Sequence, residues 1–76
     1  MTLLDSTTDI GKIVRIDGDD AVRTRLVDMG LIGARYKIRI KKSGAILVDF
    51  FGESWRFSAV VDQRVAKRLF VVEGTV

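Results

Sequence analysis

The fold is decided by the stretch Asp19-Asp20-Ala21-Val22-Arg23-Thr24-Arg25-Leu26-Val27-Asp28-Met29-Gly30-Leu31. Val22, Leu26 and Met29 recur at the spacing that places side chains on one face of an α-helix. The pattern therefore predicts an amphipathic helix over about residues 19–29. We expect this apolar face to cover a hydrophobic core.

The two ends of the predicted helix carry different signals. Asp19 or Asp20 can accept from the free N–H groups of the first turn, and Gly30 can end the helix in the left-handed conformation. A calcium loop starting at Asp17 is disfavoured, because Val22 stands where such a loop needs glycine. A weak divalent metal site made by Asp17, Asp19 and Asp20 stays open as an alternative, since oxygen ligands suit hard cations.

The size and composition limit both fold and function. A chain of 76 residues makes a single domain, and without cysteine or histidine it has no disulfide or structural zinc site. The absence of histidine also removes the commonest general acid or base, so we expect no enzyme and no resident cofactor. A net charge of +3 allows an anionic partner without requiring one. No apolar run has the roughly 20 residues of a membrane span, which favours a soluble cytoplasmic protein.

The first strands are read from alternation. The β-branched segment at residues 10–16 predicts a strand with Val14 and Ile16 on one face and Ile13 on the other, and Gly11 suggests a bulge or a close backbone approach. Residues 35–42 alternate strictly, which predicts a half-buried strand. Its inward side chains are Tyr36, Ile38 and Ile40.

The alternation of inward and outward residues predicts two hairpins. A three-residue loop at 43–45 sets Ile40 opposite Val48 and Ile38 opposite Phe50, whereas a two-residue loop would bury a carboxylate. A turn at Gly52-Glu53 follows. Its inward pairs are Phe50 with Trp55, Val48 with Phe57 and Ile46 with Ala59. The outer face carries a charge ladder made by Arg39, Asp49 and Arg56.

The C-terminal part completes an all-β fold. Asp62 can cap a short helical turn over residues 62–68, residues 69–72 read as a last strand, and residues 73–76 read as a frayed tail. Five short strands with one helix and one helical turn form two layers only if the sheet bends strongly. We therefore predict one domain over residues 1–76, a small β-barrel.

The order of these signals resembles a known family. The residues that carry the resemblance are Leu3 and Leu4, Gly11, Ile13, Ile16 and Gly18, then Arg25-Leu26-Val27-Asp28-Met29-Gly30-Leu31, and Ala66, Leu69 and Val71. They resemble the FeoA family, the small cytosolic component of bacterial ferrous iron uptake. The chain departs from the family pattern at 32–34, where a proline is missing, at Asp62, and at 43–45, where the hairpin is short.

The resemblance implies an SH3-like barrel and an accessory role in the cytoplasm. The implied partner is the ferrous permease FeoB or its GTPase domain. For the partner surface we select the loop after the helix and two outward positions of a strand, namely Gly30, Leu31, Ile32, Gly33, Leu47 and Phe51. Pairing of edge strands into a weak homo-oligomer stays open.

Nucleic-acid binding is the alternative from another class. Lys37, Arg39 and Lys41 point outward along one predicted strand, and small barrels do bind oligonucleotides. Asp49 partly neutralises this strip. The predicted parity also turns the aromatic rings of the two hairpins inward, which leaves few rings to stack on bases.

Overall fold

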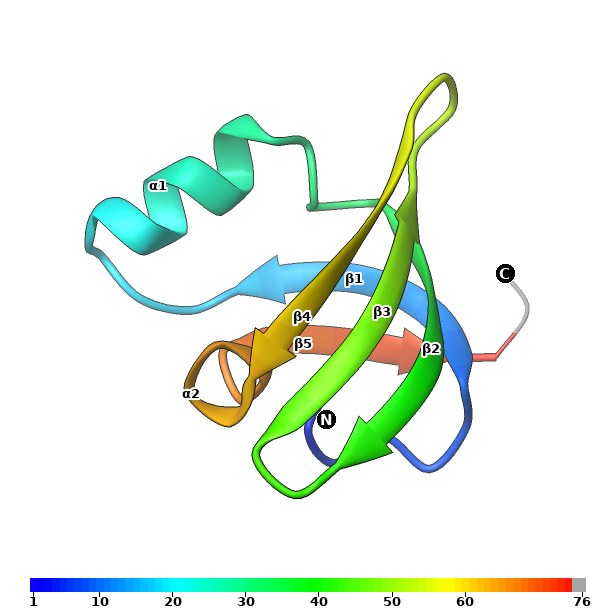
Figure 1. Ribbon diagram of the computed structural model, residues 1–76. Coiled ribbons are helices and arrows are strands. Elements are labelled where there is room, and N and C mark those ends of the chain that lie inside the picture. The colour runs from blue at the N-terminus through cyan, green and yellow to red at the C-terminus, as the bar shows by residue number, and fades with distance from the viewer. Residues whose placement is uncertain (75–76) are drawn as a thin grey trace.

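The computed structural model describes residues 1–74, and Figure 1 shows its arrangement. The elements are β1 (Ile10–Ile16), α1 (Ala21–Asp28), β2 (Arg35–Lys42), β3 (Ala45–Phe51), β4 (Arg56–Asp62), α2 (Gln63–Ala66) and β5 (Leu69–Glu73). The strands form one antiparallel sheet in the order β4-β3-β2-β1-β5. The sheet bends so that β1 and β5 lie behind β3 and β4 (Figure 1). The predicted all-β, SH3-like fold with one helix and one helical turn is confirmed.

The core lies inside the bend of the sheet. Its largest fully buried side chains are Tyr36, Phe50, Leu3, Ile13, Ile16, Leu31, Ile46, Leu69 and Val48. Trp55 and Phe57 pack against this cluster while staying partly exposed. No helix in residues 1–74 combines the length and hydrophobicity needed to cross a membrane.

The first hairpin differs from its predicted register. Lys42 pairs with Ala45, so the loop has two residues, and Gly44 takes the required positive φ of 81°. The predicted three-residue loop is wrong, because the register shifts between Ile38 and Ile40. This bulge leaves Arg39 unpaired and keeps Ile38 and Phe50 inward. It also turns Ile40 outward, against our prediction.

The second hairpin is shifted by two residues from the prediction. Phe50 pairs with Phe57 rather than with Trp55, and the Gly52 N–H donates to the Trp55 carbonyl at 2.9 Å. The turn therefore falls at residues 53–54. A side chain at Gly52 would overlap the Trp55 indole, so the ring occupies the space that a missing Cβ leaves. A shift of two preserves every face, so the predicted inward positions hold.

A β-bulge in β1 also changes which of its side chains face the core. The register shifts between Ile13 and Arg15, which leaves Val14 without a partner on β5. Ile13 and Ile16 are therefore both buried, whereas Val14 is exposed. The predicted close approach at Gly11 is confirmed, because a Cβ there would meet the Tyr36 hydroxyl and the Val72 carbonyl.

Helix α1 begins and ends close to its predicted limits but packs differently. Asp20 caps it by accepting from the Arg23 N–H at 3.1 Å, and Gly30 follows with a φ of 86°. However, Val22 and Met29 are 42% and 43% exposed, and no residue of α1 is buried. The prediction that this face covers the core therefore holds for Leu26, which packs against the core, and is wrong for Val22 and Met29. Buried side chains from the following loop, α2 and β5 close the core there instead. These are Leu31, Ala66 and Leu69.

Both ends of the described chain are bonded to the sheet. At the start of the chain, the Met1 carbonyl accepts from the Val71 N–H at 2.9 Å, and Thr2 forms a bridge with Phe70. At the other end, Glu73 belongs to β5 and the Gly74 N–H donates to the Ile10 carbonyl at 2.9 Å. The frayed tail was therefore wrongly predicted for residues 73 and 74, and its last two residues lie outside the described part.

Candidate partner surface

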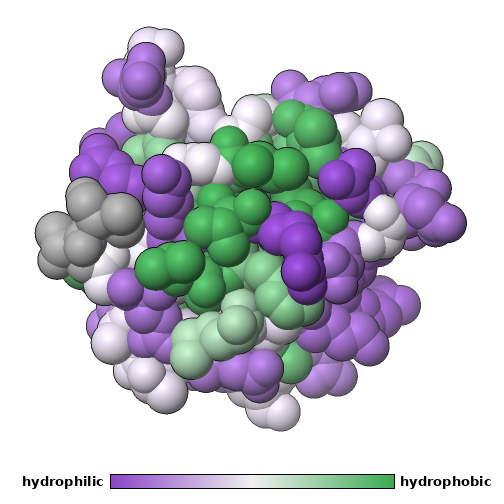
Figure 2. Space-filling view, turned by 180° about the vertical axis from the view of Figure 1, so that it is seen from behind, coloured by the Kyte–Doolittle hydropathy of each residue, from purple (hydrophilic) through white to green (hydrophobic). Residues whose placement is uncertain are grey.

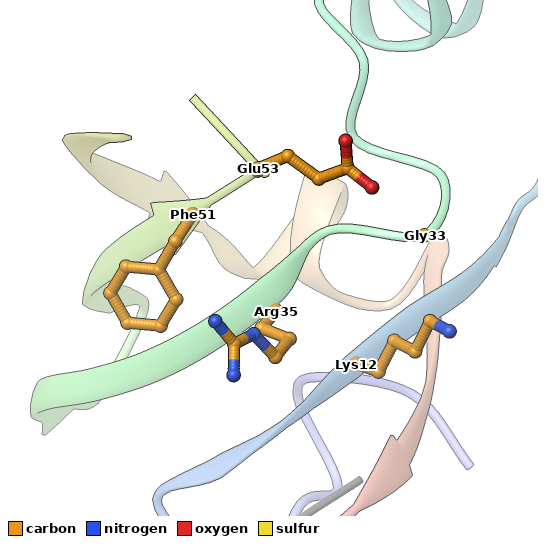
Figure 3. A pocket seen from close by; sticks show the side chains of 6 residues that line it. Lys12, Gly33, Arg35, Phe51 and Glu53 are labelled. Atoms are coloured by element: carbon orange, nitrogen blue, oxygen red, sulfur yellow. The ribbon is translucent and has the colours of Figure 1, made fainter. Parts of the chain in front are cut away.

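A hollow of about 390 Å³ lies where the loop after α1 meets the end of β3. Its lining residues, which define the Phe51 hollow, are Lys12, Gly33, Arg35, Phe51, Gly52 and Glu53. Figure 3 shows Lys12, Arg35 and Phe51 side by side on three strands, with Glu53 reaching toward the loop at Gly33. The hollow brings together two residues selected from the sequence, Gly33 and Phe51.

Strand register explains this arrangement. Lys12 pairs with Arg35, Arg35 pairs with Phe51, and Phe51 pairs with Arg56. Paired residues of a sheet point to the same face, so the four side chains form one row across four strands. The Arg35 guanidinium carbon lies 6.0 Å from the Phe51 ring centroid, at the limit of a cation–π contact. The row therefore presents an aromatic ring among cations.

The loop after α1 borders the same hollow. Its backbone is fixed to β1, since the Gly33 N–H donates to the Ile13 carbonyl and the Ile13 N–H donates to the Ala34 carbonyl, both at 2.8 Å. Leu31 is only 2% exposed, so its side chain anchors the loop in the core and is not available to a partner. Ile32 is exposed beside Gly33. The available surface of the loop thus consists of Gly30, Ile32 and Gly33.

Leu47 belongs to a different part of the same sheet face. It lines a shallow depression with Arg39, Ile40, Asp49, Arg56 and Ser58. Arg39 Nη1 lies 3.1 Å from Asp49 Oδ2, so the predicted pairing of these two charges is confirmed. Ser58 Oγ also donates to Asp49, and this bond, aided by Arg39, holds the pKa of the Asp49 carboxyl below its usual value. Asp49, with its partners Arg39 and Ser58, therefore lies between Leu47 and Phe51 on this face.

The acidic residues before α1 are engaged within the chain. Arg15 Nε lies 3.0 Å from Asp17 Oδ1, and Arg68 Nη2 lies 2.6 Å from Asp20 Oδ1. The contact with Arg68 is the main reason that the pKa of Asp20 is lowered. Across residues 1–74 we find no cluster of three or more His, Cys, Asp or Glu side chains arranged to hold a metal. The candidates Asp17, Asp19 and Asp20 are not brought together as ligands.

The basic strand offers few free cations. Arg39 is paired with Asp49, and the Lys41 ammonium donates to the Ser6 carbonyl at 2.9 Å. Lys37 is exposed, and it stands opposite Asp49 across the strand pair. The rings of Trp55 and Phe57 stack on each other with centroids 5.4 Å apart. At the three selected positions Lys37, Arg39 and Lys41, β2 therefore does not offer the free cations beside exposed rings that stacking on bases uses.

An apolar patch lies on the face seen from behind in Figure 2, which is the side of β1 and β5 in Figure 1. Val14 of β1 and Val72 of β5 are among the exposed apolar residues of these strands. On the same strand pair, the Arg15 guanidinium lies 4.0 Å from the Phe70 ring centroid. Sequence reasoning had selected none of these residues, since the bulge that exposes Val14 is not visible in the pattern.

Comparison with known proteins shows what the chain is similar to. No family model matches it. No curated protein matches it either. A solved structure does: the crystal structure of the iron uptake regulatory protein FeoA covers 95% of this chain and 93% of its own, with a TM-score of 0.68 and 28% sequence identity. The chain is thus similar to FeoA in fold and in sequence over nearly its whole length, which supports a diverged FeoA-like domain.

Proposed function

We propose that this chain is an accessory protein of ferrous iron transport that acts in the cytoplasm by binding the FeoB-type permease or its GTPase domain. The observation that carries the proposal is the similarity, over 95% of the chain, to a protein described as an iron uptake regulator. The chain also lacks histidine and cysteine, which favours binding over catalysis. The proposal requires no metal or cofactor held by this chain.

The Phe51 hollow is the surface that we assign to the permease. Partly buried aromatic rings flanked by arginine are typical anchors of protein interfaces. Lys12 and Arg35 form no ion pair with a residue in 1–74, so their charges remain available to a partner. The row therefore suits an acidic surface that also offers an apolar group to Phe51, and Ile32 adds apolar area at its border.

Binding to the purified cytosolic domain of a ferrous permease from the same genome tests the proposal. We expect saturable association by calorimetry. We expect the variants Phe51→Ser and Arg35→Glu each to raise Kd at least about tenfold, which is about 1.4 kcal/mol. Lys42→Glu is the matched control, because it changes the net charge equally at the far end of β2. Circular dichroism of each variant checks that the fold is retained.

Two results would contradict the proposal. One is the absence of association at high micromolar concentration with folded protein. The other is an equal loss of binding in Lys42→Glu and Arg35→Glu, which would indicate nonspecific charge attraction. A parallel titration with single-stranded and duplex oligonucleotides tests the nucleic-acid alternative. Salt-sensitive binding there, with none to the permease domain, would replace our proposal.

A further inference from the structure

The two edges of the sheet differ in whether another segment bonds to their backbone groups. At β5, residues 1–3 run along the outer side, where the Leu3 N–H donates to the Leu69 carbonyl at 2.8 Å and the Val71 N–H donates to Met1. At β4, no backbone group of residues 56–62 bonds to anything other than β3 and α2 within the part of the chain that the structure describes. An uncovered, regular edge strand is a template for pairing with another strand.

The register identifies which groups of β4 face this open edge. Gly52 and Trp55 are a hydrogen-bonded pair, and such pairs alternate along an antiparallel ladder. The next hydrogen-bonded pair toward the sheet is therefore Phe50 with Phe57. It follows that Phe57, Ala59 and Val61 direct their N–H and C=O groups to β3. The groups of Arg56, Ser58 and Val60 point to the open edge.

We infer that β4 pairs antiparallel with β4 of a second copy of this chain, about a two-fold axis at Ala59. This register sets Arg56 opposite Asp62 of the other copy and Ser58 opposite Val60, so the groups that face the open edge meet each other. It uses the whole strand and places opposite charges together at both ends. A shift by two residues would oppose Arg56 to Val60, or Ser58 to Asp62, and would lose the charge match.

The charged residues are free enough to pair in this way. Arg56 is exposed, and no ion pair involves it among residues 1–74. Asp62 caps α2 by accepting from the Val65 N–H through Oδ1, while Oδ2 lies 3.3 Å from the exposed Arg64. The Asp62 side chain is 45% exposed. Oδ2 can therefore accept from a guanidinium of the other copy without loss of the cap.

An apolar row on the outer face also favours a second copy as the partner of β4. Ile40 pairs with Leu47 and Leu47 pairs with Val60, so these side chains form a row that ends at the open edge. Val60 is 71% exposed, the highest value among the exposed large apolar residues. In the proposed register the two Val60 side chains are diagonal neighbours on the same face of the paired strands. The two rows then become one, which removes apolar surface from water.

The pairing is weak, because one strand pair and one apolar row bury less area than a stable interface requires. Analytical ultracentrifugation over a wide concentration range tests it. We expect the mass to rise with concentration from the monomer value of 8.5 kDa toward twice that value. Val60→Lys should abolish the rise, and Arg56→Glu should raise the dissociation constant at least about fivefold. Val72→Lys is the matched control, an exposed valine on the other edge strand, and should leave it unchanged.

Cross-linking tests the register. The chain has no cysteine, so Ala59→Cys introduces a single thiol at the predicted axis. Non-hydrogen-bonded pairs bring Cα atoms to about 4.5 Å, within the range of a disulfide. We expect Ala59→Cys to form a covalent dimer faster than Ser58→Cys or Val60→Cys. A monomer at all concentrations, faster cross-linking at 58 or 60, or a dimer lost in Val72→Lys but kept in Val60→Lys would overturn the inference. None of these results depends on the permease.

Discussion

Arg68 joins the turn before β5 to Asp20 in the turn before α1, with Arg68 Nη2 2.6 Å from Asp20 Oδ1. Arg68 Nε also donates to the Asp17 carbonyl at 3.0 Å. Because no residue of α1 is buried, these contacts hold the helix in place together with the bond from Arg23 Nε to the Ile16 carbonyl at 2.8 Å. These polar contacts act beside the packing of Leu26 and Val27 against the core.

Removing the Arg68 contact should loosen α1 without unfolding the sheet. We expect the amides of residues 21–28 in Arg68→Met to exchange up to about fivefold faster, as fits an ion pair of about 1 kcal/mol or less. The amides of β2 and β3 should be unchanged. Hydrogen exchange measures this difference. Arg64→Met is the control, since Arg64 is 84% exposed, and an equal effect in both variants would contradict the assignment.

Gly52→Ala should displace Trp55. A Cβ at residue 52 would overlap the indole, so the ring has to move or the turn has to open. We expect a loss of about 1–3 kcal/mol in the free energy of unfolding, as for overpacking. Because Trp55 is the single tryptophan, a red shift of the emission reports the movement directly. Ser54→Ala in the same turn should change neither quantity. Normal emission from Gly52→Ala would contradict the packing described here.

Glu73 should make the fold sensitive to acid. The Thr7 N–H donates to its carboxylate at 3.0 Å, and with the bonds from Thr8 this lowers the pKa of Glu73 from 4.5 to about 2. A lowered pKa in the folded state gives stability that is complete above pH 4.5 and is lost as the pH falls toward 2. Glu73→Gln should therefore melt at a lower temperature at pH 7 and lose less stability between pH 4.5 and 2.

A matched variant separates this effect from general acid sensitivity. Glu53 is exposed, and neither a hydrogen bond nor an ion pair involves its carboxylate within residues 1–74. Glu53→Gln should therefore follow the unmodified protein in thermal melts at every pH. If Glu73→Gln also follows it, then the bonds to Thr7 and Thr8 do not contribute to stability.

Tyr36→Phe should stabilise the protein. The Tyr36 hydroxyl is buried without a hydrogen-bond partner in residues 1–74, and burial raises its pKa. A buried unsatisfied polar group costs about 1–3 kcal/mol, so its removal should raise the free energy of unfolding by about 1 kcal/mol. Urea denaturation followed by Trp55 fluorescence measures the change. A loss of stability in Tyr36→Phe would show that the hydroxyl has a partner.

Much of the fold was accessible from local patterns. The caps at Asp20 and Asp62 and the left-handed Gly30 are each decided by neighbouring residues, and all three are confirmed. Most inward and outward faces of the two hairpins were also predicted correctly, because the second hairpin differs from its predicted register by two residues. Ile40, which lies next to the bulge in the first hairpin and pairs one residue away from its predicted partner, is the exception. Periodicity therefore sets the face of a residue more securely than its partner.

The errors come from features without a local signal. The bulges that leave Val14 and Arg39 unpaired contain no glycine, so nothing in the pattern marks them. The exposure of Val22 depends on which distant residues close the core. For the same reason the contribution of Lys12 and Arg35 to the Phe51 hollow was missed, since it requires the registers of three strands. Gly33 and Phe51 were selected, and the structure places both in that hollow.

The N-terminal residues along β5 limit how large an assembly can become. With most of that side occupied, β4 is the longest uncovered edge of the described sheet. When a second copy pairs with β4 about a two-fold axis, the open β4 edge of both chains becomes occupied. Association through β4 therefore stops at a pair and does not propagate into a fibre.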